Sequence, residues 1–143
     1  MSRWETTSTF EGAASPADVW KKAYADAAAW PKWNGELKSA KLDGPLRLGA
    51  TAKIVFKTGL RLRFEVVEFE QGRLFTDEAR LPGARMGHRH LVEAGDDGGS
   101  RLTNTIYIEG PLASLWRRVI GPRAASSLPN AQQAIIEIAM PRK

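Results

Sequence analysis

The middle of the chain alternates between apolar and polar residues, and this alternation restricts the possible folds more than any other feature. It is clearest in residues 60–66, where Leu, Leu, Phe and Val occupy the even positions and Arg, Arg and Glu the odd ones. Successive side chains of a β-strand point to opposite faces, so such a strand has one dry and one solvated face. This pattern is typical of an antiparallel sheet that is covered on one side.

Turn signals divide this region into further strands. Gly-rich or Pro-containing pairs such as Gln71-Gly72 and Pro82-Gly83 separate segments that favour extended structure, and Asp43-Gly44-Pro45 is a strong turn signal. We therefore expect seven strands, at residues 3–11, 37–42, 50–58, 60–70, 73–81, 84–93 and 101–109.

Helical periodicity occurs near both ends of the chain. Ser15-Pro16 predicts a helix start after the first strand, and Trp30-Pro31 is expected to end that helical region, because a residue before proline avoids the α conformation. Gly121-Pro122 and Pro129 predict a kink or short break in a long C-terminal helix. Spacings of three and four predict one buried face of this helix, formed by Leu112, Leu115, Trp116, Val119, Ile120, Ala124, Leu128, Ala131, Ile135 and Ile138.

Length and composition indicate a single α+β domain over residues 1–143. The chain is 43% hydrophobic and 26% charged, which is ordinary for a globular protein, and it has no cysteine. No run of 18 apolar residues is present, so we expect no transmembrane helix. The first residues form no apolar secretory signal, and we expect a cytoplasmic protein.

The net charge of +5 is spread over the whole sequence rather than collected in one segment. Basic residues occur at most in pairs, such as Lys21-Lys22 and Arg117-Arg118, and they alternate with acidic residues in the strands. Nucleic-acid surfaces usually show a basic stripe with interleaved aromatic residues. We therefore expect no nucleic-acid partner.

Four polar residues share the predicted dry face of three consecutive strands. Asp77 has the parity of its apolar neighbours, as do His88 and His90 on the next strand and Asn104 on the last. A hairpin centred on Pro82-Gly83 places Asp77 opposite His88, and the next hairpin places His90 opposite Asn104. These residues are expected to form one polar cluster on the inner face of the sheet.

Such a cluster has more than one interpretation. A carboxylate beside an imidazole can orient it for acid–base chemistry, so Asp77 and His88 are candidate catalytic residues. A buried, hydrogen-bonded structural cluster is the other reading, because buried polar groups require partners. The two histidines lack a third inward ligand other than Asp77, and we expect neither a metal nor a cofactor.

Several local motifs accompany this element order: Trp20, Trp30-Pro31-Lys32-Trp33, Asp43-Gly44-Pro45 to Gly49, Leu81-Pro82-Gly83-Ala84, Gly110-Pro111-Leu112, Gly121 and Leu128-Pro129. Together, the order and the motifs resemble the polyketide cyclase/dehydrase-type branch of the SRPBCC (START-like) superfamily. The resemblance covers nearly the whole chain, and it implies a helix-grip fold: a curved seven-stranded antiparallel sheet around a long kinked C-terminal helix, with two short helices after the first strand. Members include lipid carriers, aromatase-cyclases and pollen-allergen-like binders, without a shared catalytic signature.

From this fold we expect a cavity between sheet and helix that binds a hydrophobic or amphipathic small molecule. A cyclase or dehydratase-type enzyme and a partner-binding module are the alternatives, and the protein is expected to be a monomer or homodimer that does not insert into membranes. We expect the ligand-binding cavity to be lined by His88, His90, Asp77, Asn104, Phe56, Phe64, Phe75, Met86, Ile106 and Trp116. Phe56, Phe64, Phe75, Ile106 and Trp116 are further predicted to line one continuous interior with the C-terminal helix.

Overall fold

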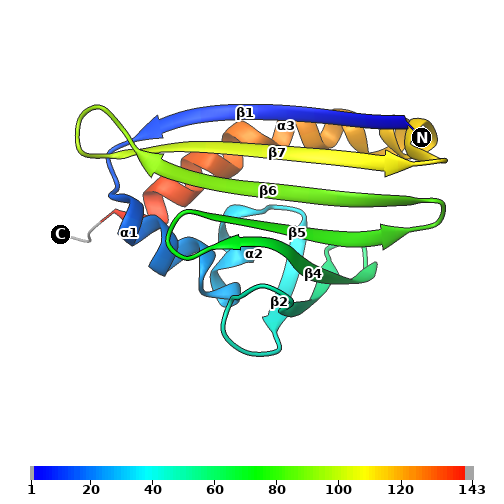
Figure 1. The fold of residues 1–143 in the computed structure, drawn as a ribbon, viewed down its shortest axis with the longest axis horizontal. Helices are drawn as coiled ribbons and strands as arrows, with labels where there is room; N and C mark the ends of the chain where they lie inside the picture. Colours follow the sequence, from blue (N-terminus) through cyan, green and yellow to red (C-terminus); the bar gives the residue numbers. More distant parts are fainter. Residues whose placement is uncertain (1, 141–143) are drawn as a thin grey trace.

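The structure, a computed structural model, describes residues 2–140 and contains one antiparallel sheet of seven strands in the order β1-β7-β6-β5-β4-β3-β2. The α+β helix-grip architecture is therefore as predicted (Figure 1). The strands are β1 (Ser2–Gly12), β2 (Leu37–Leu42), β3 (Thr51–Phe56), β4 (Arg61–Glu70), β5 (Leu74–Leu81), β6 (Ala84–Ala94) and β7 (Ser100–Gly110).

The long helix α3 (Ala113–Ala139) packs along one face of this sheet, which we call the inner face. It contacts β1, β7 and β6, and its C-terminal end lies beside the short helix α1 (Pro16–Val19) (Figure 1). Because β1 pairs with β7 over its whole length, the first and last strands lie side by side under this helix.

The segment between β1 and β2 forms a series of short helical turns. After α1 come a π-helical turn (Trp20–Tyr24), a 3-10 turn (Ala27–Ala29) and the helix α2 (Trp30–Trp33). The predicted helix end at Trp30-Pro31 is wrong, since these two residues begin α2. Proline is tolerated there because a helix needs no N–H donor in its first turn.

The prolines predicted to interrupt α3 do not break it into two helices. The helix runs without interruption from Ala113 to Ala139 and includes Pro122 and Pro129. Both prolines lie seven positions apart on the exposed side of the helix, where carbonyl groups that lose their donor remain open to water.

In the first half of α3 the predicted buried face is wrong for Leu112, Leu115 and Val119, whereas Trp116 and Ile120 are half-buried. Leu115 and Val119 are 55% and 66% exposed, and the side of the helix that faces the sheet there carries small residues such as Ala113 and Gly121. A Cβ atom on Gly121 would lie 3.3 Å from the ring of Trp4, so the Trp4 side chain of β1 already fills this space. The helix is therefore rotated relative to the face that the large apolar residues suggest.

The interior consists of two apolar clusters rather than the one continuous interior expected. The larger cluster surrounds Phe75, with Phe56 and Phe64 half-buried at its border. The smaller one lies at the first turns of α3 and contains Ile108 together with half-buried Trp116. None of the five predicted interior residues is fully exposed, but they do not form a single contact network.

Candidate functional site

The polar residues predicted to meet on the inner face lie together in the structure. The strand register is the predicted one, with Asp77 opposite His88 and His90 opposite Asn104. Asp77, His90 and Asn104 are buried and His88 is half-buried. The rings of His88 and His90 stack with their centroids 3.8 Å apart, so the cluster is compact.

The side-chain hydrogen bond of Asp77 differs from the predicted pair. Its Oδ2 atom lies 3.3 Å from Nε2 of His90, on the diagonal, rather than bonding to the directly opposed His88. Side chains on neighbouring strands reach diagonal partners when they are long enough, and an imidazole is. The expected Asp77–His88 acid–base pair is thus replaced by an Asp77–His90 contact.

Gln132 of α3 completes the cluster and was missed by the sequence analysis. Its Nε2 atom lies 2.7 Å from the backbone carbonyl of Ser8, 3.3 Å from that of Leu102 and 3.0 Å from Oδ1 of Asn104, so its two hydrogens serve three acceptors and one hydrogen is shared. Its Oε1 atom accepts a hydrogen bond from the Ser8 hydroxyl at 2.7 Å. Its position on the apolar face of the helix, four residues after Leu128 and three before Ile135, is the sequence signal that could have identified it.

These contacts assign the protons of the cluster. Backbone carbonyls only accept, so they fix the amide of Gln132, which in turn makes Oδ1 of Asn104 an acceptor. The amide nitrogen of Asn104 then donates to Nε2 of His88 at 3.4 Å and to Nδ1 of His90 at 3.3 Å. Both imidazoles are therefore neutral, with the proton on Nδ1 of His88 and on Nε2 of His90.

Burial lowers the pKa values of both histidines, which favours the neutral imidazoles assigned above. Burial lowers the pKa of His90 to about 3. Burial and the neighbouring His90 hold the pKa of His88 well below its usual range, although Asp77 opposes this. Burial also raises the pKa of Asp77 to about 7, against the attraction of His88.

Asp77→Asn is expected to stabilise the protein at pH 8 relative to wild type and to have little effect near pH 4. Between about pH 4 and 7 the folded state retains a proton on Asp77 that the unfolded state releases, so raising the pH destabilises wild type over this interval. One pKa unit corresponds to about 1.4 kcal/mol, so the gain is a few kcal/mol at most. Urea unfolding at several pH values measures it.

The exposed loop residue Asp97 provides the matched control, since Asp97→Asn removes the same charge without a buried partner.

The two histidines make stability rise with pH, opposite to the effect of Asp77, because the unfolded state binds protons on them below about pH 6.5. The stability of Asp77→Asn should therefore rise more steeply with pH than that of wild type. Parallel pH profiles for the two proteins would contradict the assigned role of Asp77.

A cavity of about 400 Å³ opens beside this cluster, between α3 and the inner face of the sheet. His88 and Ile106 contribute from β6 and β7, and Trp33 contributes from α2. The mouth carries an ion pair between Glu36, which lines the cavity, and Arg123 of α3, at 3.6 Å. The remaining lining residues are Asn34, Gly35, Ser127, Leu128, Asn130 and Ala131.

Of the residues expected to line a ligand, His88 and Ile106 border this cavity. Asp77, His90 and Asn104 lie behind His88 in the buried cluster. The others serve packing: Phe56, Phe64 and Phe75 belong to the larger apolar cluster, and Met86 and Trp116 to the smaller one.

The cluster has no arrangement typical of a metal centre. Within residues 2–140, no three His, Asp or Glu side chains are placed to share a metal ion. None of the helices in this part of the chain is both long and apolar enough to cross a lipid bilayer.

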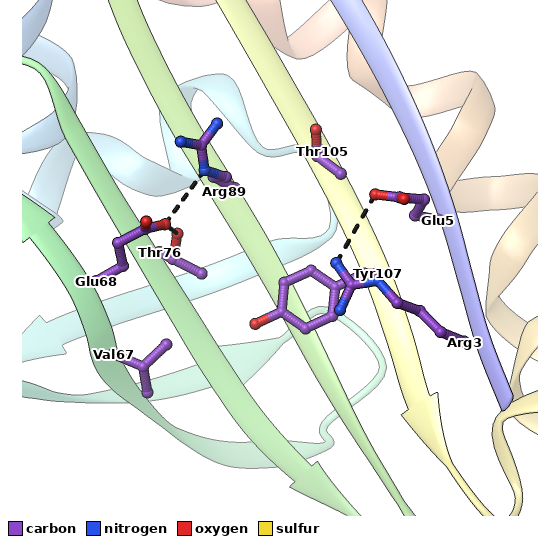
Figure 2. A pocket seen from close by; sticks show the side chains of 8 residues that line it. All are labelled: Arg3, Glu5, Val67, Glu68, Thr76, Arg89, Thr105 and Tyr107. Atoms are coloured by element: carbon purple, nitrogen blue, oxygen red, sulfur yellow. Dashed lines mark hydrogen bonds and ion pairs between the residues drawn. The ribbon is translucent and has the colours of Figure 1, made fainter. Parts of the chain in front are cut away.

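A second depression, of about 380 Å³, lies on the opposite, outer face of the sheet (Figure 2). Its charged side chains are paired with one another: Arg89 bonds to Glu68 at 3.2 Å, and Arg3 lies 3.8 Å from Glu5. The guanidinium of Arg3 also lies 4.3 Å from the centre of the Tyr107 ring. The Tyr107 hydroxyl donates to Glu78. These contacts form a polar surface network, and the inner cavity is the other candidate site.

Gly87→Ala is expected to disrupt this outer network. Gly87 lies beneath the Tyr107 ring, and a methyl group at this position would overlap ring atoms. The ring would have to move away from Glu78, at a cost of about 1–3 kcal/mol in unfolding free energy. Chemical denaturation measures the loss, and Gly35→Ala, where a Cβ meets nothing within 4 Å, is the control. Equal stability of both variants would contradict the close packing described here.

Comparisons with known proteins agree with this architecture. A family model described as polyketide cyclase / dehydrase and lipid transport matches residues 3–136. No curated protein matches the chain. Truncated norcoclaurine synthase from Thalictrum flavum is similar in structure, with a TM-score of 0.75 and 14% sequence identity, and the alignment covers 99% of this chain and 96% of that one.

Two further solved structures share the fold. Ara h 8.0201 has a TM-score of 0.68 and 12% identity, covering 95% of this chain and 99% of its own. The di-domain ARO/CYC BexL from the BE-7585A biosynthetic pathway has a TM-score of 0.73 and 14% identity, covering 99% of this chain and 51% of its own. At these identities the structural likeness shows the fold alone. The match of the family model over nearly the whole chain shows that this protein belongs to the polyketide cyclase / dehydrase and lipid transport family, in the START-like superfamily.

Proposed function

We propose that the protein binds a small amphipathic molecule in the inner cavity, with His88 donating a hydrogen bond to an oxygen atom of that molecule. The observation that carries the proposal is a cavity of about 400 Å³ bordered by a half-buried histidine whose proton position is fixed by its neighbours. Cavities of this size are typical of small-molecule sites.

The lining suits a ligand with an apolar body and at least one polar group. Ile106, Leu128 and Trp33 supply apolar walls, whereas Asn34 and Asn130 supply polar groups. Pockets of this composition gain affinity from apolar burial and specificity from a few placed polar groups. Neither a purely aliphatic molecule nor a highly charged one matches this lining.

His88 supports the choice of an oxygen acceptor. Its Nε2 atom already accepts from Asn104, so the proton lies on Nδ1, and that N–H has no partner among residues 2–140. A carbonyl or hydroxyl oxygen of the ligand satisfies this donor. Leaving a half-buried donor without a partner costs free energy, which favours ligands that carry such an oxygen.

The same geometry favours binding over acid–base catalysis by a cyclase or dehydratase-type enzyme. A general base needs a free lone pair, but the lone pair of His88 is used by Asn104. A neutral imidazole is also a very weak acid. Asp77 has a pKa near neutrality but lies in the buried cluster, and it is not among the residues that border the cavity. We therefore rank an enzyme below a binding protein.

Ser127→Phe is expected to abolish binding of anilinonaphthalene sulfonate, an amphipathic fluorescent probe that should occupy one saturable site in wild type. Ser127 borders the cavity and is half-exposed, so a phenyl ring there can fill the space at little cost in stability. Ser126→Phe is the matched control, because Ser126 is exposed and does not border the cavity. Titration of probe fluorescence gives the stoichiometry and the dissociation constant.

His88→Leu tests the polar half of the proposal, since it keeps an apolar wall but removes the donor. It should lower the affinity for ligands that carry an acceptor oxygen by about five- to tenfold, as expected for the loss of one hydrogen bond. The affinity for their deoxy analogues should not change. Absence of saturable probe binding in wild type, or equal binding by Ser127→Phe, would refute the proposed function.

A further inference from the structure

The first half of α3 exposes a strip of large apolar side chains. Leu112, Leu115 and Val119 are 43%, 55% and 66% exposed. Their spacing of three and four residues places them on one side of the helix, and exposed Pro122 follows on the same side. We call Leu112, Leu115 and Val119 the α3 strip. Scattered exposed apolar residues are common, whereas three on one side of one helix are a candidate interaction surface.

Positive charge surrounds this strip. From Gly110 to Ile136 the sequence contains three arginines and no acidic residue. Arg118 follows Leu115 by three positions and Arg123 follows Val119 by four, so guanidinium groups lie on both sides of the strip. Arg117 and Arg118 have no ion-pair partner within residues 2–140, and Arg123 has only the exposed contact with Glu36.

The strip is held in place by the sheet beneath it. The backbone N–H of Leu112 donates to the carbonyl of Gly83 at 2.9 Å, and the indole N–H of Trp116 donates to the carbonyl of Pro82 at 2.8 Å. Both acceptors lie in the turn between β5 and β6. The exposed leucine and valine side chains are thus presented by a fixed helix rather than by a loose segment, which lowers the entropic cost of binding.

The arrangement of charge decides which partner fits. A second copy of this chain, packed by two-fold symmetry on the same strip, would bring Arg118 and Arg123 of both copies together. Three side chains are also far too small a surface for a stable dimer, which needs about 800 Å² from each partner. An anionic lipid surface, in contrast, takes up apolar side chains and neutralises the flanking arginines.

We propose that the first half of α3 docks the protein reversibly on anionic lipid bilayers, with the α3 strip buried among the lipid headgroups and acyl chains. Apolar residues flanked by arginines on one helix are the usual composition of interfacial helices. The docking is peripheral and involves no membrane-spanning segment. It does not depend on what the inner cavity binds.

Vesicle flotation with purified protein tests the proposal. We expect binding to vesicles of equal parts phosphatidylcholine and phosphatidylglycerol, weaker binding in high salt, and little binding to phosphatidylcholine alone. The double variant Leu115→Ser/Val119→Ser should reduce binding to the anionic vesicles by about tenfold or more. Arg118→Gln should reduce it by about fivefold, since one arginine near such a surface contributes about 1 kcal/mol.

Leu48→Ser/Leu60→Ser is the matched control. These leucines are 61% and 54% exposed but lie outside α3, so the control loses as much exposed apolar surface without touching the strip. Failure of wild type to bind anionic vesicles, or an equal loss with the control, would overturn the proposal. A concentration-dependent dimer that Leu115→Ser/Val119→Ser abolishes would assign the strip to a second copy instead and also overturn it. The assay contains no cavity ligand, so its outcome is independent of the proposed function.

Discussion

Replacing Phe75 by alanine is expected to lower the free energy of unfolding by about 3–5 kcal/mol, as is usual for a fully buried phenylalanine. Phe75 has no exposed surface. Its ring stacks on His90 at 4.2 Å between centroids and on Trp30 at 6.0 Å, and it meets the edge of Tyr24 at 5.4 Å. Tyr24 and Trp33 also contact His90, so the truncation removes the central one of several aromatic side chains that join the helical turns before β2 to the polar cluster.

Phe64→Ala is the control for this prediction. Phe64 is half-buried at the border of the same apolar cluster, so its truncation leaves a void that water can enter. The loss should be smaller than for Phe75. Thermal and urea unfolding of both variants measure the difference, and the near-ultraviolet circular dichroism of Phe75→Ala should show a loosened aromatic environment. Equal losses would contradict the central position given to Phe75.

Gln132→Leu is expected to lower the unfolding free energy by about 2–4 kcal/mol, although the two side chains have similar volume. The substitution removes the donor of Oδ1 of Asn104 and one hydrogen bond from each of the carbonyls of Ser8 and Leu102. A buried acceptor left without a donor costs about 1–3 kcal/mol, and each lost hydrogen bond about 1 kcal/mol, with local rearrangement offsetting part of the sum.

The exposed neighbour Gln133 provides the control, since Gln133→Leu removes only a contact of 3.3 Å with Glu137. A second readout separates the orienting role of Gln132 from simple packing. Without its donor, Asn104 can rotate and offer its oxygen to an imidazolium, so the pKa values of His88 and His90 should rise. Histidine titration by NMR measures this rise. Unchanged titration curves would show that Gln132 does not orient Asn104.

Turn chemistry and alternation were sufficient to predict the sheet and its register. Pro82-Gly83 fixes the hairpin between β5 and β6, and the alternation of apolar and polar residues then leaves only one register that keeps Phe75 and Val92 inside. The same parity placed Asp77, His88, His90 and Asn104 on the inner face. The pairing of residues across the strands could be predicted because it depends only on counting residues from a turn.

The hydrogen-bond partners of individual side chains could not be predicted from the sheet register. Asp77 bonds diagonally to His90 because imidazole and carboxylate reach beyond the directly opposed position, and a register does not distinguish the two partners. The partners of Gln132, among them the backbone carbonyls of Ser8 and Leu102, could not be predicted because they depend on how α3 packs on the sheet. The cavity residues Asn34 and Asn130 come from segments whose approach depends on the whole fold.

The rotation of α3 was mispredicted for a physical reason. Periodicity favours the face with the largest apolar residues, which in the first half is the face of Leu115 and Val119. The structure instead turns Ala113 and Gly121 toward the sheet, because Trp4 of β1 occupies the room that larger side chains would need. One large residue on a distant strand can therefore decide which face of a helix is buried.

The side-by-side arrangement of β1 and β7 also determines the order in which the chain can fold. Thr7 and Thr105, whose hydroxyls bond across these strands, are 98 positions apart in the sequence, whereas β2 to β7 follow one another as hairpins. Local hairpins close quickly, but a pairing of such long range must first overcome the entropy of a large loop. During synthesis β1 has no partner until β7 has left the ribosome, so the early strand is exposed to aggregation until the chain is nearly finished.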